Sequence, residues 1–140
     1  WSSPAASPAR YQRDLDHLVA VARRHGMTDD AAVRDRIADL HTRVEGYRGH
    51  ALRTLARLAD GESLGPEASV TKLLWSELER DLYETTRELL GTEAETAVDP
   101  EWQNRYWYAR AATIYAGTSE IQRNVIAERV LGLPRGAAAR

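Results

Sequence analysis

The chain of 140 residues has the length of one domain with a single hydrophobic core, and its net charge of −2 gives no reason to expect nucleic acid or an anionic membrane as partner. The absence of cysteine excludes disulfides, thiolate catalysis and cysteine-ligated zinc, and we expect no metal site. Because no apolar run approaches the roughly 20 residues of a membrane span, and residues 1–10 lack the apolar segment of a signal peptide, we expect a cytoplasmic protein.

The first two predicted helices have clear boundaries. Ser7 followed by Pro8 is typical of an N-cap and a first helical position, and Gly26 ends the segment. Asp29 or Asp30 can cap a second, longer helix that continues to Gly61. Apolar residues of this second segment recur at alternating steps of four and three, which predicts a stripe facing a bundle. They are Val33, Ile37, Leu40, Val44, Tyr47, Ala51, Leu55 and Leu58.

Two glycines interrupt this second helix. Gly46 and Gly49 each cost about 1 kcal/mol relative to alanine in a helix interior. A close crossing of another helix would explain both. We therefore predict a structural role for them.

A third helix is predicted to begin at Gly65-Pro66 and to end at Gly91, with leucines lining one side. The composition then turns polar until Asp99 and Pro100 restart a helix as cap and first position. An aromatic series follows, which is typical of a core or a subunit interface rather than a ligand cage. Its members are Trp102, Tyr106, Trp107, Tyr108 and Tyr115.

These segments predict an all-α fold, an up-down antiparallel helical bundle, over residues 8–135. No segment shows the sustained alternation of a strand. Residues 1–7, rich in serine, proline and alanine, are predicted to be a flexible leader, and 136–140 a flexible tail. Apolar side chains on the helical stripes are expected in the interior: Leu40, Val44, Leu74, Leu78 and Ile121.

The most informative segment is the start of the last predicted helix, which runs from Ser119 to Leu131. Gly117 interrupts the preceding helix, and Thr118 can cap the next by accepting a hydrogen bond from the amide of Glu120 or Ile121. Such a turn presents backbone N–H groups that suit a phosphate or a carbonyl oxygen with developing negative charge. Taken alone, these four residues are more often an ordinary helical corner.

The longer string is more specific. It reads Ile114-Tyr115-Ala116-Gly117-Thr118-Ser119-Glu120-Ile121-Gln122-Arg123, followed by a helix that ends in Leu131-Gly132. This string resembles the C-terminal signature of the acyl-CoA dehydrogenases. The resemblance implies that the chain is the C-terminal bundle of a longer enzyme, which uses FAD to oxidise an acyl-CoA thioester at its α,β bond.

The resemblance also implies roles for five residues. The backbone N–H of Ala116 would polarise the thioester carbonyl. Tyr115 would line the acyl or thioester pocket, and the alternative interpretation is that Tyr115 is a buried packing residue. Gly117, Thr118 and Glu120 would contact FAD: the glycine by close backbone approach, Thr118 at the pyrophosphate, and Glu120 at the flavin.

The catalytic base is not identified within the chain. The commonest base of the family is a glutamate at the position of Ala116, and an alanine cannot accept a proton. Some branches carry a small residue here and place the base on an earlier helix, which would lie at or before Trp1. The catalytic residue therefore stays unknown, and we expect the fragment alone to be inactive.

Three further family elements are altered. Arg23 and Arg24 stand where an Arg-x-x-Phe-Gly element is usual, Glu88 to Thr92 replaces Gln-x-x-Gly-Gly, and Trp107 to Ala109 replaces Arg-Asp-Ala. These departures indicate a divergent branch that uses bulky acyl-CoA substrates or pairs two unlike subunits.

Two other hypotheses stay open from the sequence. One is a non-catalytic partner subunit or oligomerisation bundle of a heteromeric acyl-CoA dehydrogenase. The other, which the signature disfavours, is a generic helical interaction module. For the enzyme, the resemblance implies an acyl-CoA substrate, a homo- or hetero-oligomer such as a dimer or tetramer, and electron-transfer flavoprotein or a similar acceptor.

Overall fold

The computed structural model describes residues 7–96 and 99–135, and within these ranges every regular element is helical. The elements are α1 (Pro8–Arg24), α2 (Ala31–Ala59), α3 (Ala68–Leu90), α4 (Glu93–Thr96), α5 (Pro100–Ala112) and α6 (Ser119–Val125), the last continued by a π-helical segment (Ile126–Val130). The all-α fold class is thus confirmed. The predicted tail at 136–140, and all of the predicted leader except Ser7, lie outside the described residues.

Side-chain caps fix the starts of α2 and α5 as the sequence indicates. Asp30 accepts hydrogen bonds from the amides of Ala32 and Val33 at 2.8 and 3.1 Å, and Asp99 accepts one from Glu101 at 3.0 Å. Ser7 occupies the N-cap of α1, but its side chain makes no capping bond.

Glycines end α3 and the last helix where the sequence predicts it, since Gly91 and Gly132 adopt φ values of 56° and 68°. Helix α5, by contrast, ends at Ala112, before the predicted break at Gly117. The short helix α4 was not predicted. It occupies the first part of the polar stretch that follows Gly91.

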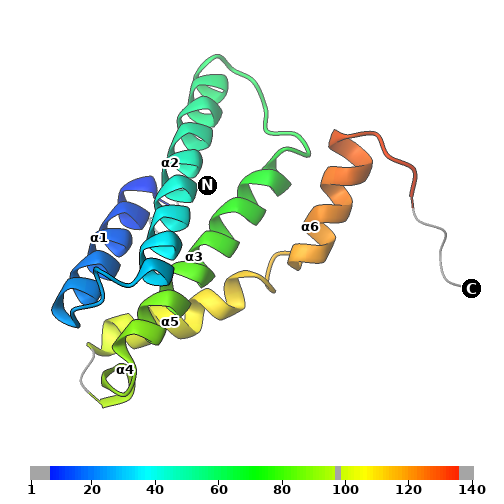
Figure 1. Ribbon diagram of the computed structural model, residues 1–140. Coiled ribbons are helices and arrows are strands. Elements are labelled where there is room, and N and C mark those ends of the chain that lie inside the picture. The colour runs from blue at the N-terminus through cyan, green and yellow to red at the C-terminus, as the bar shows by residue number, and fades with distance from the viewer. Residues whose placement is uncertain (1–6, 97–98, 136–140) are drawn as a thin grey trace, which may run out of the picture.

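Helix α3 is the centre of the arrangement. It packs against α1, α2, α5 and α6, whereas α6 stands apart from α1 and α2 in Figure 1. The first three helices run side by side in alternating directions, as an up-down bundle requires. The largest core cluster lies between them: Tyr11, Leu15, Leu18, Leu40, Val44, Tyr47, Leu78 and Leu82.

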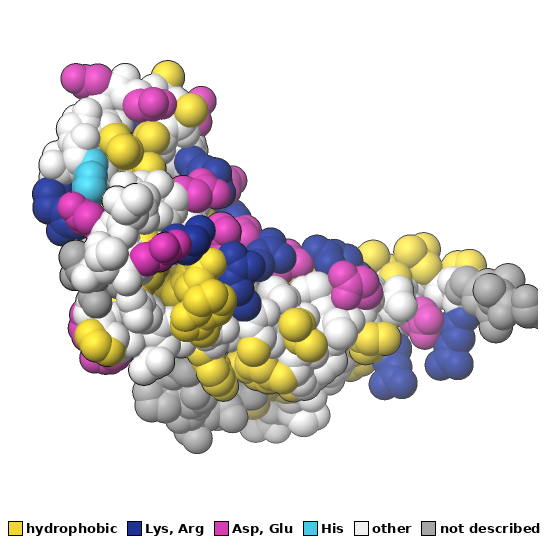
Figure 2. Space-filling view, turned by 90° about the horizontal axis from the view of Figure 1, so that it is seen from below, with side chains coloured by type: hydrophobic (Ala, Val, Ile, Leu, Met, Phe, Trp, Pro, Cys, Tyr) yellow, Lys and Arg dark blue, Asp and Glu magenta, His cyan; other side chains and the backbone are white. Residues whose placement is uncertain are grey.

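The prediction of which side chains lie in the interior is partly wrong. Leu40, Val44 and Leu78 are buried, but Leu74 is 41% exposed and Ile121 is 52% exposed. The far end of the α2 stripe, at Leu55 and Leu58, is also exposed. These positions lie on apolar helix faces that no other described element covers. Hydrophobic side chains accordingly lie between charged ones on the face shown in Figure 2.

The helix crossing predicted at Gly46 and Gly49 is not found. A Cβ atom added at either glycine would meet no other atom within 4 Å. Both glycines lie on the exposed side of α2, so within the described chain no close approach requires them.

Candidate functional site

The candidate site is the turn between α5 and α6, residues 113–118. After α5 ends, the amide of Tyr115 still donates to the Ala111 carbonyl at 3.0 Å, and the chain then reverses. Ala116 and Gly117 adopt consecutive positive φ values of 53° and 93°. Ala116 is the one non-glycine residue with positive φ in the described ranges. A side chain is disfavoured there by about 1–2 kcal/mol, so the turn holds Ala116 in a strained backbone conformation.

Thr118 caps α6 as predicted. Its Oγ1 accepts a hydrogen bond from the amide of Ile121 at 3.4 Å, and its backbone is extended. The Ser119 amide donates back to the Thr113 carbonyl at 3.0 Å, which closes the turn. The amides of Ala116, Gly117 and Thr118 in this turn donate no hydrogen bond to another group of the described chain. Three neighbouring N–H groups are therefore available to a ligand.

Glu120 is the second residue of α6, and its side chain folds back onto the helix start. Its carboxylate accepts a hydrogen bond from its own backbone amide and a second from the Thr118 hydroxyl, and both lower the pKa of Glu120 below its ordinary value. The side chain is exposed, so it is free to turn away when another anion approaches.

A buried glutamine holds the turn from inside. Gln122 Nε2 donates to the Ala116 carbonyl at 2.9 Å and lies 3.4 Å from the Gly117 carbonyl. A Cβ atom at Gly117 would lie only 2.6 Å from the same nitrogen, so a side chain there would displace Gln122. Gly117 is thus required both for its positive φ and for this close approach.

Tyr115 lies among aromatic rings beside the turn. Its ring centre is 6.2 Å from that of Trp75 on α3 and 5.6 Å from that of Tyr108 on α5. Burial, and secondly a hydrogen bond with Tyr108, raise the pKa of the Tyr115 phenol well above its ordinary value. The ring remains 37% exposed, so one side of it still faces the surroundings and can form part of a ligand-binding wall.

The other aromatic residues divide between core and surface. Tyr106 is buried with its ring stacked on Trp102 at 5.8 Å, whereas Trp107 and Tyr108 are mostly exposed. The two exposed rings have the placement expected of an interface.

The altered family elements lie elsewhere on the bundle. Arg24 forms an ion pair with Glu93 at 3.0 Å, while Arg23 is exposed. Glu88 pairs with Arg36 at 2.9 Å, and Gly91 serves as the C-terminal cap of α3. A carboxylate thus already neutralises Arg24, which weakens the case for a phosphate there.

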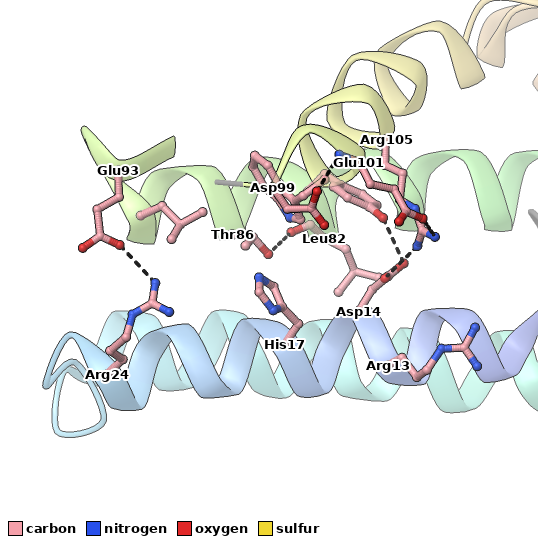
Figure 3. Close-up of a pocket in the computed structure, with 13 residues that line it drawn as sticks. Arg13, Asp14, His17, Arg24, Leu82, Thr86, Glu93, Asp99, Glu101 and Arg105 are labelled. Atoms are coloured by element: carbon pink, nitrogen blue, oxygen red, sulfur yellow. Dashed lines mark hydrogen bonds and ion pairs between the residues drawn. The ribbon is translucent and has the colours of Figure 1, made fainter. Parts of the chain in front are cut away.

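A separate cleft of about 390 Å³ lies between α1, α3 and α5 (Figure 3). His17 points into it from α1, and the residues of the turn are not among those that line it. Its charged residues are of both signs and partly paired: Arg105 with Glu101 at 2.5 Å, and Arg24 with Glu93. This balance favours neither an anion nor a cation. Nor is any group of three metal-ligating side chains found in the described ranges.

Comparison with known proteins decides between a common helical corner and a family signature. A family model described as "Acyl-CoA dehydrogenase, C-terminal domain" matches residues 2–131. The chain belongs to the acyl-CoA dehydrogenase family. Both the predicted resemblance and the predicted fold are thereby confirmed.

Two sequence relatives are acyl-CoA dehydrogenases named IpdE1. The protein from Mycobacterium tuberculosis is 44% identical over 130 residues, which cover 91% of this chain and 33% of the relative. The protein from Mycolicibacterium smegmatis is 43% identical over 129 residues, which cover 90% and 32%. The acyl-CoA dehydrogenase domain described here therefore spans about a third of the length of these relatives.

Two solved structures share the fold at 26% identity. One is a "Tcur3481-Tcur3483 steroid ACAD", with a TM-score of 0.77 over 94% of this chain and 36% of that chain. The other is the ChsE4-ChsE5 complex from Mycobacterium tuberculosis, with a TM-score of 0.71 and the same coverage.

Sequence reasoning missed two residues at the turn, Gln122 and Lys72. Gln122 stands inside the signature string, so its presence was visible but its contact with Ala116 was not. Lys72 lies 40 positions before the carbonyl that it contacts, and no local pattern connects the two. Among residues 7–96 and 99–135, every helix is too short or too polar to span a bilayer.

Proposed function

We propose that this chain is the C-terminal domain of an FAD-dependent acyl-CoA dehydrogenase that oxidises an acyl-CoA thioester at its α,β bond. The observation that carries the proposal is the turn at Ala116, where three neighbouring amides donate no hydrogen bond in the described chain. Membership of the family supports the reaction type, and the chain contributes one part of the active site.

The chemistry requires a donor at the thioester carbonyl. An α-carbon proton is too weakly acidic to be removed unless the carbonyl oxygen is stabilised as it becomes enolate-like, and preorganised N–H groups provide that stabilisation. The N–H of Ala116 takes this role and is unaffected by the loss of a glutamate side chain at this position. Tyr115 contributes to the wall of the acyl or thioester pocket.

The residues of the turn fit FAD. The Thr118 hydroxyl and the amides of Gly117 and Thr118 would hold the pyrophosphate at the start of α6, with Glu120 near the flavin. Glu120 has to leave the Thr118 hydroxyl for this, and its exposure permits the movement. Bound FAD would supply the acceptor for the β-hydrogen, which leaves as hydride.

The base is proposed to come from outside this chain. The methyl group of Ala116 cannot take a proton, and the carboxylate of Glu120 is engaged at the helix start. A carboxylate on an earlier helix of the full-length enzyme would reach the same α-proton, as in family branches with a small residue at this position.

The partner is proposed to be an unlike acyl-CoA dehydrogenase subunit, and the substrate an acyl-CoA with a bulky ring-containing acyl group. Two observations support this. Both solved relatives carry two component names, and one of them is called a steroid enzyme. The apolar side chains left uncovered on α5, on α6 and in the turn between them, among them Trp107, Ile121 and Ile114, supply an interface. Electrons would pass to electron-transfer flavoprotein or a similar acceptor in the cytoplasm.

A second candidate is a non-catalytic subunit that keeps the fold and the interface but has no base. The observation that favours it is the alanine at position 116, because the residue at the usual base position then has no carboxylate. The absence of any carboxylate on the preceding helix of the full-length protein would support this second candidate.

The test is flavin retention by the full-length protein, expressed with and without the neighbouring acyl-CoA dehydrogenase subunit. We expect a yellow complex, and we expect Thr118→Val to weaken FAD binding by about 0.5–1.5 kcal/mol, the worth of one neutral hydrogen bond. Thr113→Val is the matched control, because its hydroxyl only donates to the Arg110 carbonyl at 3.3 Å. A full-length complex that holds no flavin would contradict the proposal.

A further inference from the structure

Lys72 connects α3 to the end of α5. It is the one lysine among the 19 basic residues of the chain. Its Nζ donates a hydrogen bond to the carbonyl of Ala112, the last residue of α5. The last carbonyls of a helix have no partner within the helix, and a cation there also meets the negative end of the helix dipole. Lys72 therefore acts as a C-terminal cap of α5.

The same ammonium group lies over two aromatic rings. It is 5.4 Å from the ring centre of Trp75 and 5.6 Å from that of Tyr115. Tyr115 directly precedes Ala116. One cation thus contacts the segment 112–115 at its first and last residue, immediately before the turn. Burial lowers the pKa of Lys72 below its ordinary value, which Glu77 partly opposes.

Helix α3 also holds the far side of the turn. Arg123 on α6 forms an ion pair with Glu77 of α3 at 2.5 Å. Glu77 follows Lys72 by five positions on the same helix. Because Lys72 holds the end of α5 and Glu77 holds α6, both helices that flank the turn are fixed to one rigid element. Gln122 then fixes the Ala116 carbonyl from within.

We propose that Lys72 is a positioning residue for the dehydrogenation, which fixes the peptide that carries the Ala116 N–H in the direction needed at the thioester carbonyl. This inference rests on the proposed function. The contact suits lysine rather than arginine, since a compact ammonium fits one carbonyl and two ring faces, whereas a planar guanidinium is wider and makes paired contacts.

The first experiment measures hydrogen exchange in the full-length protein with its partner subunit. Lys72→Met keeps the length of the side chain and removes its charge. We expect the amides of Tyr115 and Ser119, which donate to the Ala111 and Thr113 carbonyls, to exchange about tenfold faster. Lys72→Arg should give an intermediate rate. Unchanged exchange at both amides in Lys72→Met would overturn the inference.

The matched control is Arg43→Met. Arg43 also joins a helix to α3 through one long cation, by an ion pair with Asp81 at 2.9 Å, but it lies on α2. Its replacement should leave exchange at Tyr115 and Ser119 unchanged. If it raises exchange there as much as Lys72→Met does, the effect is a general loosening of the bundle and the inference fails.

The second experiment compares kinetic constants of the flavin-loaded enzyme. Lys72→Met should lower kcat by about ten- to a hundredfold, approaching the loss of a carbonyl-polarising donor, with KM and flavin content within about threefold of wild type. Lys72→Arg should restore part of kcat. Equal kcat in all three proteins would overturn the inference. If wild type holds no flavin, the proposed function fails, and the exchange at Tyr115 and Ser119 still decides whether Lys72 holds the turn.

Discussion

The side-chain amide of Gln122 and the carbonyl oxygen of Ala116 lie 2.9 Å apart, and this hydrogen bond fixes the peptide plane at the centre of the turn. A trans peptide directs its C=O and N–H to opposite sides. With the Ala116 carbonyl directed at buried Gln122, the N–H of Gly117 is directed away from Gln122. The interior glutamine thus helps to present the turn's donors to a ligand.

Gln122→Met should destabilise the fold by about 0.5–1.5 kcal/mol, because one hydrogen bond is lost while the side-chain length is kept. The measurement is urea unfolding of the full-length protein. The control is Gln12→Met, whose side chain donates to Asp16 at 2.9 Å on the surface of α1. Equal losses in the two variants would contradict a special role for Gln122.

Ala116→Gly should leave stability unchanged or raise it by up to about 1.5 kcal/mol. Relief of the positive φ is worth about 1–2 kcal/mol, and the greater freedom of glycine in the unfolded chain offsets about 0.5–1 kcal/mol of it. Ala111→Gly, at an exposed position inside α5, should instead cost about 1 kcal/mol. Thermal unfolding of both variants tests this, and the same loss in each would show that Ala116 is not strained.

Arg10 on α1 and Glu79 on α3 form a buried ion pair. Arg10 is 8% exposed and Glu79 is 1% exposed. Arg10→Met should cost about 3–5 kcal/mol because it leaves a buried carboxylate unpaired, whereas Arg10→Met with Glu79→Leu should recover much of that loss. The exposed pair of Arg36 and Glu88 provides the control, and Arg36→Met should cost about 0–1 kcal/mol. A double variant as unstable as Arg10→Met would contradict this.

The loss in Arg10→Met should also depend on pH. Burial raises the pKa of Glu79 even beside Arg10, and without Arg10 it should rise further. A carboxyl group with a raised pKa in the folded state stabilises the fold at acid pH and loses that contribution as pH rises. The variant should therefore be closest to wild type in acid, with the gap widening toward neutral pH in urea unfolding. A gap that narrows would reverse the assignment.

Alkaline pH should destabilise the bundle through its buried tyrosines. Burial raises the pKa of Tyr47 to about 12 and that of Tyr83 to about 12, from an ordinary value of 10.0. The folded state then keeps protons that the unfolded chain releases, so this stability is present below pH 10 and is lost as pH rises toward 12. Each phenol contributes about 1.4 kcal/mol per pH unit in this window. Tyr83→Phe should lower the slope of unfolding free energy against pH by that amount, and an unchanged slope would contradict the prediction.

The helix boundaries could be read from the sequence because caps and breakers act locally. Asp30, Asp99 and Thr118 each accept hydrogen bonds from amides two or three positions ahead, and Gly91 ends α3 through its own φ. Such contacts depend on a few adjacent residues. The sequence therefore contains all the information that determines them.

Long-range pairing and coverage could not be read in the same way. Periodicity shows that Leu74 and Ile121 lie on apolar helix faces, but not whether another element covers those faces. The partner of Lys72 is 40 positions away and that of Arg10 is 69 positions away, so only the packing of α3 brings them together. At the candidate site, the sequence motif predicted the turn and the Thr118 cap. The contacts that hold the turn in place were found only in the structure.

The most direct test is anaerobic mixing of the full-length protein, together with the proposed partner subunit, with a panel of acyl-CoA thioesters that includes fused-ring acyl groups. We expect the flavin absorbance of the wild type to bleach with Ala116 in place. We also expect removal of the proposed carboxylate on the preceding helix to slow bleaching by about 10²–10⁴-fold. A wild type that binds FAD but bleaches only after Ala116→Glu would contradict the account and favour the non-catalytic subunit.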